Sequence, residues 1–200
     1  QAAINNSVRK IIFASSCAVY PLSPHKKVSE EMSVNGSSPY SISKLSSEDM
    51  LNFYADNFGI ETCSLRCFNI YGPKQSTDSM YSAVIPTFIK YAKNGDELKL
   101  YNSGNQTRDF IHVSDVVNFY CIAAEENIAG IYNLGTGKET KIKDLANKIL
   151  SFENRSSTKN LPAKPGDALS SCADMTKASK DTGFQSKISL EEGLKNLYFG

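Results

Sequence analysis

Tyr40 and Lys44 lie four residues apart and, with the upstream Ser16, carry the residue types needed for proton transfer at an alcohol. Residues at this spacing share one face of a helix, so a phenol and an ammonium can reach the same ligand. A nearby ammonium favours the phenolate and lowers the pKa of a tyrosine toward a range that suits acid–base catalysis. These groups could remove a proton from a sugar or alcohol hydroxyl while a cofactor accepts hydride.

The spacing alone is a weak signal, because ten tyrosines in a lysine-rich chain give about one Tyr-x-x-x-Lys by chance. The alternative is an ordinary pair on an exposed helix face. However, Tyr40 is the only tyrosine with a lysine four residues later, and it follows Ser38-Pro39 at a predicted helix start. This context favours a functional pair.

Composition limits the other classes of function. The 200 residues suit one domain, or one domain with part of another, and 40% hydrophobic residues are enough for a core. A net charge of +1 argues against a nucleic-acid partner. The apolar stretches have the length of strands, so neither secretion nor a membrane span is supported. Five cysteines, an odd number lying mostly in apolar runs, indicate reduced core thiols of a cytoplasmic protein. With two histidines and no Cys-x-x-Cys, we expect no metal site.

The order of elements predicts an α/β fold. The apolar run 10–15 is typical of a strand buried in a parallel sheet, and a helix over 39–58 leads to a second strand over 61–68. A polar loop is expected over 69–81 and a mobile connection over 151–160. We expect Ser114, Thr140 and Ser189 to cap helices. The further predicted helices and strands cover 83–93, 98–101, 114–126, 131–134, 140–150 and 190–198.

These segments resemble the extended short-chain dehydrogenase/reductase family, especially its nucleotide-sugar epimerases. Five sequence blocks occur in the family's order. They are Ser15-Ser16-Cys17-Ala18-Val19-Tyr20, Ser38-Pro39-Tyr40 to Lys44, Leu65 to Pro73, Gln106 to Val113, and Tyr132-Asn133-Leu134-Gly135 followed by Pro165-Gly166-Asp167. The resemblance implies the C-terminal part of a doubly wound Rossmann-type parallel sheet, plus a small α/β substrate-binding domain. We expect residues 1–75 to belong mainly to the first, and 76–200 mainly to the second with some segments returning to the sheet.

The resemblance also implies roles for individual residues. Tyr40 is the acid/base residue, Lys44 binds the nicotinamide ribose of NAD, and Ser16 assists at the sugar 4-hydroxyl, with Ser15 and Phe68 also at the cofactor. Asn69 and Arg108 contact the substrate pyrophosphate, as suits a planar guanidinium. The remaining expected nucleotide-sugar contacts are Ala83, Val84, Ile85, Lys99, Leu100, Tyr101, Lys164, Asp167 and Ser171. The alternatives are a surface ion pair with Asp109 for Arg108, and core packing for Phe68 and Tyr101.

The resemblance favours a UDP-hexose 4-epimerase that interconverts UDP-glucose and UDP-galactose through a 4-keto sugar. Sugar 4,6-dehydratases carry an Asp-Glu pair where this chain has Cys17-Ala18, so dehydration is disfavoured, and so is decarboxylation. Ser171 corresponds to the family's pocket-size gate, and its small side chain leaves room for the N-acetyl group of UDP-GlcNAc or UDP-GalNAc. One alternative is a GDP-sugar 3,5-epimerase with a catalytic Cys17, although a buried thiol is favoured there, or a nucleotide-sugar dehydratase or reductase of the same family. A non-catalytic sugar-nucleotide-binding fragment is another.

Family members begin with a strand and a Gly-x-x-Gly-x-x-Gly loop that holds the cofactor pyrophosphate. The present sequence has no such motif, so we expect it to lack about the first hundred residues of a full unit and to bind NAD poorly alone. The helix over 39–58 forms a dimer interface in relatives, and we expect a homodimer for the complete protein.

Overall fold

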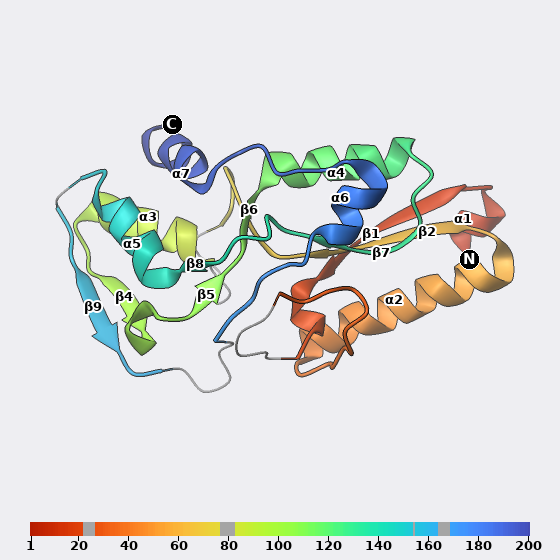
Figure 1. Cartoon of the computed structure of the whole chain (residues 1–200), viewed down its shortest axis with the longest axis horizontal. Coiled ribbons are helices and arrows are strands. Elements are labelled where there is room, and N and C mark those ends of the chain that lie inside the picture. The colour runs from red at the N-terminus through yellow and green to blue at the C-terminus, as the bar shows by residue number, and fades with distance from the viewer. Residues whose placement is uncertain (22–26, 77–82, 154, 164–168) are drawn as a thin grey trace.

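A three-stranded parallel sheet of order β1-β2-β7 organises one half of the molecule (Figure 1). The computed structural model describes residues 1–21, 27–76, 83–153, 155–163 and 169–200. Helix α2 covers one face of the sheet, and α4 and α6 lie over the other. This arrangement confirms the predicted α/β class. The bounds are Lys10–Ser16 for β1, Glu61–Cys67 for β2, Gly130–Leu134 for β7, Pro39–Phe58 for α2, Val113–Glu125 for α4 and Thr176–Thr182 for α6.

Helix α2 begins and ends where the sequence predicts. The Ser38 side chain accepts a hydrogen bond from the Ser41 amide at 3.1 Å, and the Ser41 side chain accepts one from the Ser38 amide at 2.9 Å, which forms a capping box. Pro39 occupies the first turn, and Gly59 ends the helix with a φ of 68° that glycine adopts without strain. The crossover from β1 through α2 to β2 therefore has well-defined ends.

The other half packs helices around a short parallel ribbon. Residues of α3, α5 and α7 share one apolar core with β4, whose partner is β9. The amphipathic spacing of α5 turns Leu145, Ala146 and Ile149 fully into this core. The bounds are Val84–Asn94 for α3, Ile142–Leu150 for α5, Leu190–Phe199 for α7, Leu98–Tyr101 for β4 and Thr158–Leu161 for β9.

Short strands join the two halves. Strand β3 pairs in parallel with β6, and β5 pairs antiparallel with β8. The segment with the sequence Gln-Thr-Arg-Asp-Phe contains β5 and the first residue of β6. The chain then passes directly from β6 into α4, which packs on the three-stranded sheet. Their bounds are Asn69–Tyr71 for β3, Thr107–Arg108 for β5, Phe110–His112 for β6 and Thr140–Lys141 for β8, with short helices α1 (Ala2–Asn5), η1 (Cys17–Val19) and η2 (Asn102–Gly104).

Some sequence expectations about local structure are wrong. The last residues of the segment expected to be a mobile connection belong to β9. The side chains of β9 are mostly exposed and show no apolar pattern, and the strand forms through backbone pairing with β4. The expected loop at 69–81 begins with β3. Ser114 does not cap α4: its amide donates to Nδ1 of His112 at 3.2 Å, so the histidine is the cap. Thr140 pairs with Arg108 in β8 instead of capping α5.

The five cysteines differ in exposure, and Cys17 is partly buried. Cys63, Cys67 and Cys172 are buried free thiols, as expected. Cys121 is exposed on α4, so the expectation of a core thiol is wrong there. Within the described ranges, no helix is both long and apolar enough to cross a membrane. Over the same residues, no three His, Cys, Asp or Glu side chains gather as metal ligands.

Candidate active site

Lys44 links α2 to the carboxyl end of β1. Its Nζ atom donates a 2.8 Å hydrogen bond to the carbonyl oxygen of Ala14 and lies 5.5 Å from the centroid of the Tyr40 ring. Tyr40 itself is 54% exposed in the first turn of α2, so its phenol is open to a ligand. The expected pairing of phenol and ammonium on one helix face is therefore present.

Ser16 lies at the end of β1, two residues beyond the carbonyl that Lys44 contacts. Its hydroxyl accepts a hydrogen bond from the Ala18 amide at 3.2 Å, which caps the short helix η1. The register pairs Ser16 with Cys67, so Phe68 follows at the same edge of the sheet. Ligands of open parallel sheets bind at this carboxyl edge.

Phe68 is 3% exposed and packs in a small cluster with Val19, Tyr20 and Val28. Its side chain therefore has the core role that was the alternative to a cofactor contact, and its place at the nicotinamide stays a prediction. Ser15 is also buried, and its hydroxyl donates to the Glu48 carboxylate rather than facing outward.

Asp109 holds together the segments that surround Arg108. Its fully buried carboxylate accepts hydrogen bonds from the Thr136 amide (2.9 Å), the Gly137 amide (2.9 Å) and the Ala173 amide (3.1 Å). Gly135 fits beside it because a Cβ atom there would lie 2.6 Å from Oδ2 of Asp109. The carboxylate thus has structural partners of its own, which weakens the interpretation of Arg108 as half of a surface ion pair.

Asn69 lies on β3, which pairs with β6, and Arg108 lies on β5, which pairs with β8. The Asn69 side chain donates to the backbone oxygen of Asp109 at 3.1 Å, and Nη1 of Arg108 donates to the backbone oxygen of Thr107 at 2.8 Å. Asn69 therefore contacts the backbone of Asp109, the residue that follows Arg108 in the chain. Both residues are partly exposed, and their contact with the pyrophosphate stays a prediction.

Ser171 lies beside Cys17, although 154 residues separate them. The hydroxyl of Ser171 and the sulfur of Cys17 are 3.9 Å apart. Burial raises the pKa of the Cys17 thiol to about 11, so the thiol stays protonated near neutral pH. Cys17 is partly buried, and the raised pKa supports an inert thiol over an acid/base cysteine. The contact with Cys17 also places the expected gate residue next to the end of β1.

The expected nucleotide contacts on α3 and β4 are less uniform. Ile85 and Leu100 belong to the apolar core, whereas Lys99 is exposed and Ala83, Val84 and Tyr101 are partly exposed. The side chains of Ile85 and Leu100 fill the core beneath α3 and β4, and the place of these two residues at the nucleotide stays a prediction. Lys164 and Asp167 lie outside the described residues.

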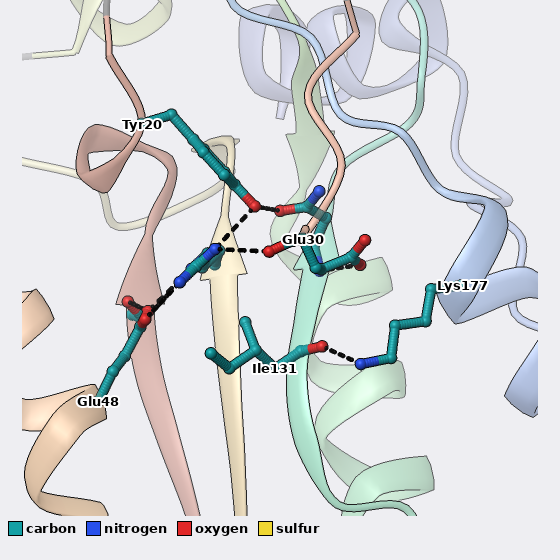
Figure 2. Close-up of polar contacts among 8 residues, drawn as sticks. Tyr20, Glu30, Glu48, Ile131 and Lys177 are labelled. Atoms are coloured by element: carbon teal, nitrogen blue, oxygen red, sulfur yellow. Dashed lines mark hydrogen bonds and ion pairs between the residues drawn. The ribbon is translucent and has the colours of Figure 1, made fainter. Parts of the chain in front are cut away.

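Sequence reasoning missed a buried polar network between α2 and the sheet (Figure 2). Glu48 and Arg66 form an ion pair of 2.6 Å with side chains that are 2% and 4% exposed. Arg66 also donates to the hydroxyl of Tyr20 at 3.1 Å, and that hydroxyl donates to Asn133 at 2.7 Å. Glu30 accepts from the Asn133 amide at 2.7 Å. A charged residue inside the buried strand 61–68 was a signal that could have revealed it, since a buried charge requires a partner.

The network sets the charge state of its central residue. Burial acts to lower the pKa of the Arg66 guanidinium, but hydrogen bonds with Glu48 and Tyr20 outweigh burial and raise the pKa above its usual value. Burial also raises the pKa of Tyr20. Arg66 is therefore a permanent cation, and Tyr20 a neutral hydrogen-bonding phenol, at physiological pH.

A comparison with known families agrees with this fold. The model of the NAD dependent epimerase/dehydratase family matches residues 1–135. The chain belongs to this family. NAD is accordingly its cofactor, and the sheet is Rossmann-type, as the sequence predicts.

Individual epimerase/dehydratase family members are similar over almost the whole chain. A UDP-glucose 4-epimerase of Mycolicibacterium smegmatis is 32% identical over 197 residues, which cover 97% of this chain and 63% of that enzyme. The structure of a UDP-N-acetylglucosamine 4-epimerase from Methanobrevibacter ruminantium, in complex with UDP-N-acetylmuramic acid, has 33% identity and a TM-score of 0.93 over 99% of this chain and 65% of that one. The UDP-glucose 4-epimerase of Thermus thermophilus, in complex with NAD, has 27% identity and a TM-score of 0.88 over 97% and 64%. The chain thus spans less than two thirds of the length of these relatives.

Proposed function

We propose that this protein is an NAD-dependent UDP-hexose 4-epimerase that interconverts UDP-glucose and UDP-galactose, and also accepts UDP-GlcNAc and UDP-GalNAc. The observation that carries the proposal is that Lys44 lies beside the Tyr40 ring and binds the backbone of β1 two residues before Ser16, at the carboxyl edge of the sheet. The similarity to 4-epimerases of UDP-sugars supports the choice of substrate class.

The donor set fits the nicotinamide end of NAD. The exposed Tyr40 phenol and the Lys44 ammonium offer hydrogen-bonding groups for ribose and sugar hydroxyls, and Lys44 uses one of its three N–H donors on Ala14. When bound, NAD would supply a reversible hydride acceptor for the sugar, so that the reaction involves no net oxidation. Among the described residues, Tyr40, Lys44 and Ser16 would hold this end of the cofactor, with Ser15 and Phe68 behind them.

In the proposed mechanism, Tyr40 takes the proton of the sugar 4-hydroxyl, and the hydrogen bond of Ser16 holds the same oxygen. Lys44 stabilises the tyrosine anion through its positive charge. Asn69 and Arg108 bind the pyrophosphate. The 4-keto sugar can then rotate in the pocket before Tyr40 returns the proton. Of the described residues, Ala83, Val84, Lys99 and Tyr101 would line the nucleotide.

Dehydration and decarboxylation are the competing reactions within the family. Elimination of water requires an acid and a base next to the serine, but Cys17 and Ala18 carry no carboxylate. A 3,5-epimerase would need Cys17 as a proton carrier, and burial keeps that thiol protonated. Both features favour the 4-epimerase.

We also propose a homodimer built on α2, and a cytoplasmic location. The outward face of α2 carries Ile42, Met50, Phe53 and Phe58, which are 52–61% exposed. An apolar stripe of this kind on one helix suits pairing with a second copy. Light scattering of the wild type and of Phe53→Lys tests this, since the substitution should yield monomers.

The test of the function is an NMR assay on the chain expressed with its adjoining coding sequence. UDP-glucose, UDP-GlcNAc and GDP-mannose are supplied separately, and the C4 and C5 protons of the sugar are followed. Inversion at C4 of a UDP-sugar, lost in Tyr40→Phe, is the expected result. Inversion at C3 or C5 would instead favour the 3,5-epimerase, and binding without turnover a non-catalytic module.

A further inference from the structure

Glu48 lies on the same face of α2 as Tyr40 and Lys44, because the three residues are spaced four apart. Tyr40 is 54% exposed, Lys44 is partly exposed, and Glu48 is 2% exposed. The face thus runs from the open edge of the sheet into the buried layer between α2 and the strands. A carboxylate at its buried end requires partners that satisfy its charge.

Glu48 and Lys44 attach α2 to β1 at adjacent residues. Lys44 donates to the backbone oxygen of Ala14, and one helical turn later Glu48 accepts from the hydroxyl of Ser15. Ser16, the proposed partner of Tyr40 at the sugar oxygen, is the next residue of β1. Any movement of α2 along β1 would therefore change the position of Tyr40 relative to Ser16.

The second partner of Glu48 is held firmly in the central strand. Nη2 of Arg66 donates to Oε2 of Glu48 at 2.6 Å, and Nε of Arg66 lies 3.1 Å from Oε1. On its other side, Arg66 donates to the hydroxyl of Tyr20 at 3.1 Å, and its Cζ atom lies 5.0 Å from the centroid of that ring. The guanidinium is therefore held from both sides by Glu48 and Tyr20, whose side chains are labelled in Figure 2.

We propose that the buried Glu48–Arg66 pair is a positioning pair for catalysis, which fixes the register of α2 on the sheet and so places Tyr40 and Lys44 against Ser16. This inference rests on the proposed function. A rotation or a one-turn shift of α2 would leave both charges buried without each other, which is far more costly than misplacing an apolar contact. A buried pair of this kind selects one arrangement more than it adds stability.

The first experiment replaces the charge while keeping the shape. In the chain expressed with its adjoining coding sequence, Glu48→Gln should lower kcat for the UDP-sugar about 10–100-fold, since a displacement of about 1 Å costs a reaction about that much. The KM should stay within about twofold, because Asn69 and Arg108 lie on other elements. Asp115→Asn is the matched control. Asp115 is a buried carboxylate on α4 that accepts hydrogen bonds from the amides of Lys187 and Ile188, each at 3.1 Å. The Asp115→Asn substitution should lower Tm without lowering kcat.

The second experiment separates positioning from stability. The double variant Glu48→Leu with Arg66→Met replaces the pair with apolar side chains, which often restores or raises stability. We expect a Tm near that of the wild type with a kcat as low as that of Glu48→Gln. A kcat equal to the wild type in this variant would overturn the proposal, because the pair would then act only in folding.

The third experiment tests whether Lys44 keeps its contact with Ala14, by a measurement that does not depend on enzyme activity. The rate of Lys44 acetylation by acetic anhydride is followed by mass spectrometry, with the exposed Lys141 as internal reference. We expect a several-fold faster rate in Glu48→Gln, because the lysine leaves Ala14, and no change in Asp115→Asn. An unchanged Lys44 rate in Glu48→Gln contradicts the positioning role. If the wild type has no epimerase activity, the proposed function fails, but this rate still decides the role of the pair.

Discussion

The ammonium of Lys44 lies 2.8 Å from the carbonyl oxygen of Ala14 and 5.0 Å from the centroid of the Phe13 ring. Both partners belong to β1, so the helix that carries Tyr40 is attached to the strand that ends in Ser16. A lysine has three N–H donors, and the bond to Ala14 uses one of them. The same side chain can therefore fix the helix and contact a ligand.

Replacing this lysine should affect both roles. Lys44→Met is expected to lower kcat by about 10²–10⁴-fold, the range for loss of acid–base catalysis, because the positive charge beside Tyr40 is removed. Lys180→Met, an exposed position at the end of α6, is the control and should leave kcat unchanged. Turnover is measured by the NMR assay of UDP-glucose. A Lys44→Met enzyme within about threefold of the wild type would argue against the assigned role.

Ser171 should control which sugars fit. Because its hydroxyl lies 3.9 Å from the sulfur of Cys17 at the end of β1, a tyrosine at 171 would fill space beside the sugar. Ser171→Tyr is expected to lower kcat/KM for UDP-GlcNAc at least about tenfold more than for UDP-glucose, since one steric clash in a pocket gives discrimination of about this size. Ser171→Ala should keep both substrates. Equal losses for the two sugars would place the gate elsewhere.

The cysteines offer a test of the 3,5-epimerase alternative. Burial raises the pKa of Cys17 to about 11 and that of Cys67 to about 12, whereas Cys121 is exposed. At pH 8, iodoacetamide should therefore alkylate Cys121 first, and mass spectrometry identifies the site. Cys17→Ser should retain C4 inversion. A loss of turnover in Cys17→Ser that matches Tyr40→Phe would move this thiol into the mechanism.

Asp174 should make the stability of α6 depend on pH. Its Oδ1 accepts hydrogen bonds from the Thr176 hydroxyl at 2.6 Å and the Thr176 amide at 2.9 Å, and these bonds lower the pKa of the carboxyl below 3.8. A carboxyl with a depressed folded-state pKa stabilises the fold above its unfolded pKa, and this contribution is lost as pH falls through the folded value. Asp174→Ala should therefore cost about 1 kcal/mol at pH 7, as for loss of a helix cap.

The difference in the free energy of unfolding between Asp174→Ala and the wild type should shrink as the pH falls below about 4, where the wild-type carboxylate becomes protonated. Urea unfolding at pH 7 and at pH 3 measures it. Asp174→Asn keeps an acceptor without the charge, so its stability relative to Asp174→Ala should vary less with pH. A gap between wild type and Asp174→Ala that is constant over this range would contradict the assignment.

The sequence predicts the elements whose signals are local. Helix α2 is bounded by Ser38, Pro39 and Gly59, and each of these residues acts through its own backbone or cap. The spacing of Tyr40 and Lys44 is likewise a local property of that helix. For this reason the main helix and the core of the candidate site could be placed before the fold was known.

Features that depend on distant partners could not be placed in this way. Strand β9 has no apolar alternation, and it forms because the backbone of β4 pairs with it. The contact of Glu48 with Arg66 joins a helix and a strand, and neither residue type by itself identifies its partner. Phe68 lies next to predicted site residues in the sequence, but the cluster around Val28 and Tyr20 buries its side chain.

Strand β2 pairs on both sides, with β1 and with β7, and six of its seven residues are buried. Its amide hydrogens can meet solvent only when one of these neighbours separates or the whole sheet opens. In a hydrogen–deuterium exchange experiment, the amides of β2 should therefore exchange last in this half of the molecule, at the rate of global unfolding. Arg66 lies within this slowest segment, so the residue that holds Glu48 is also among the last to be released when the protein unfolds.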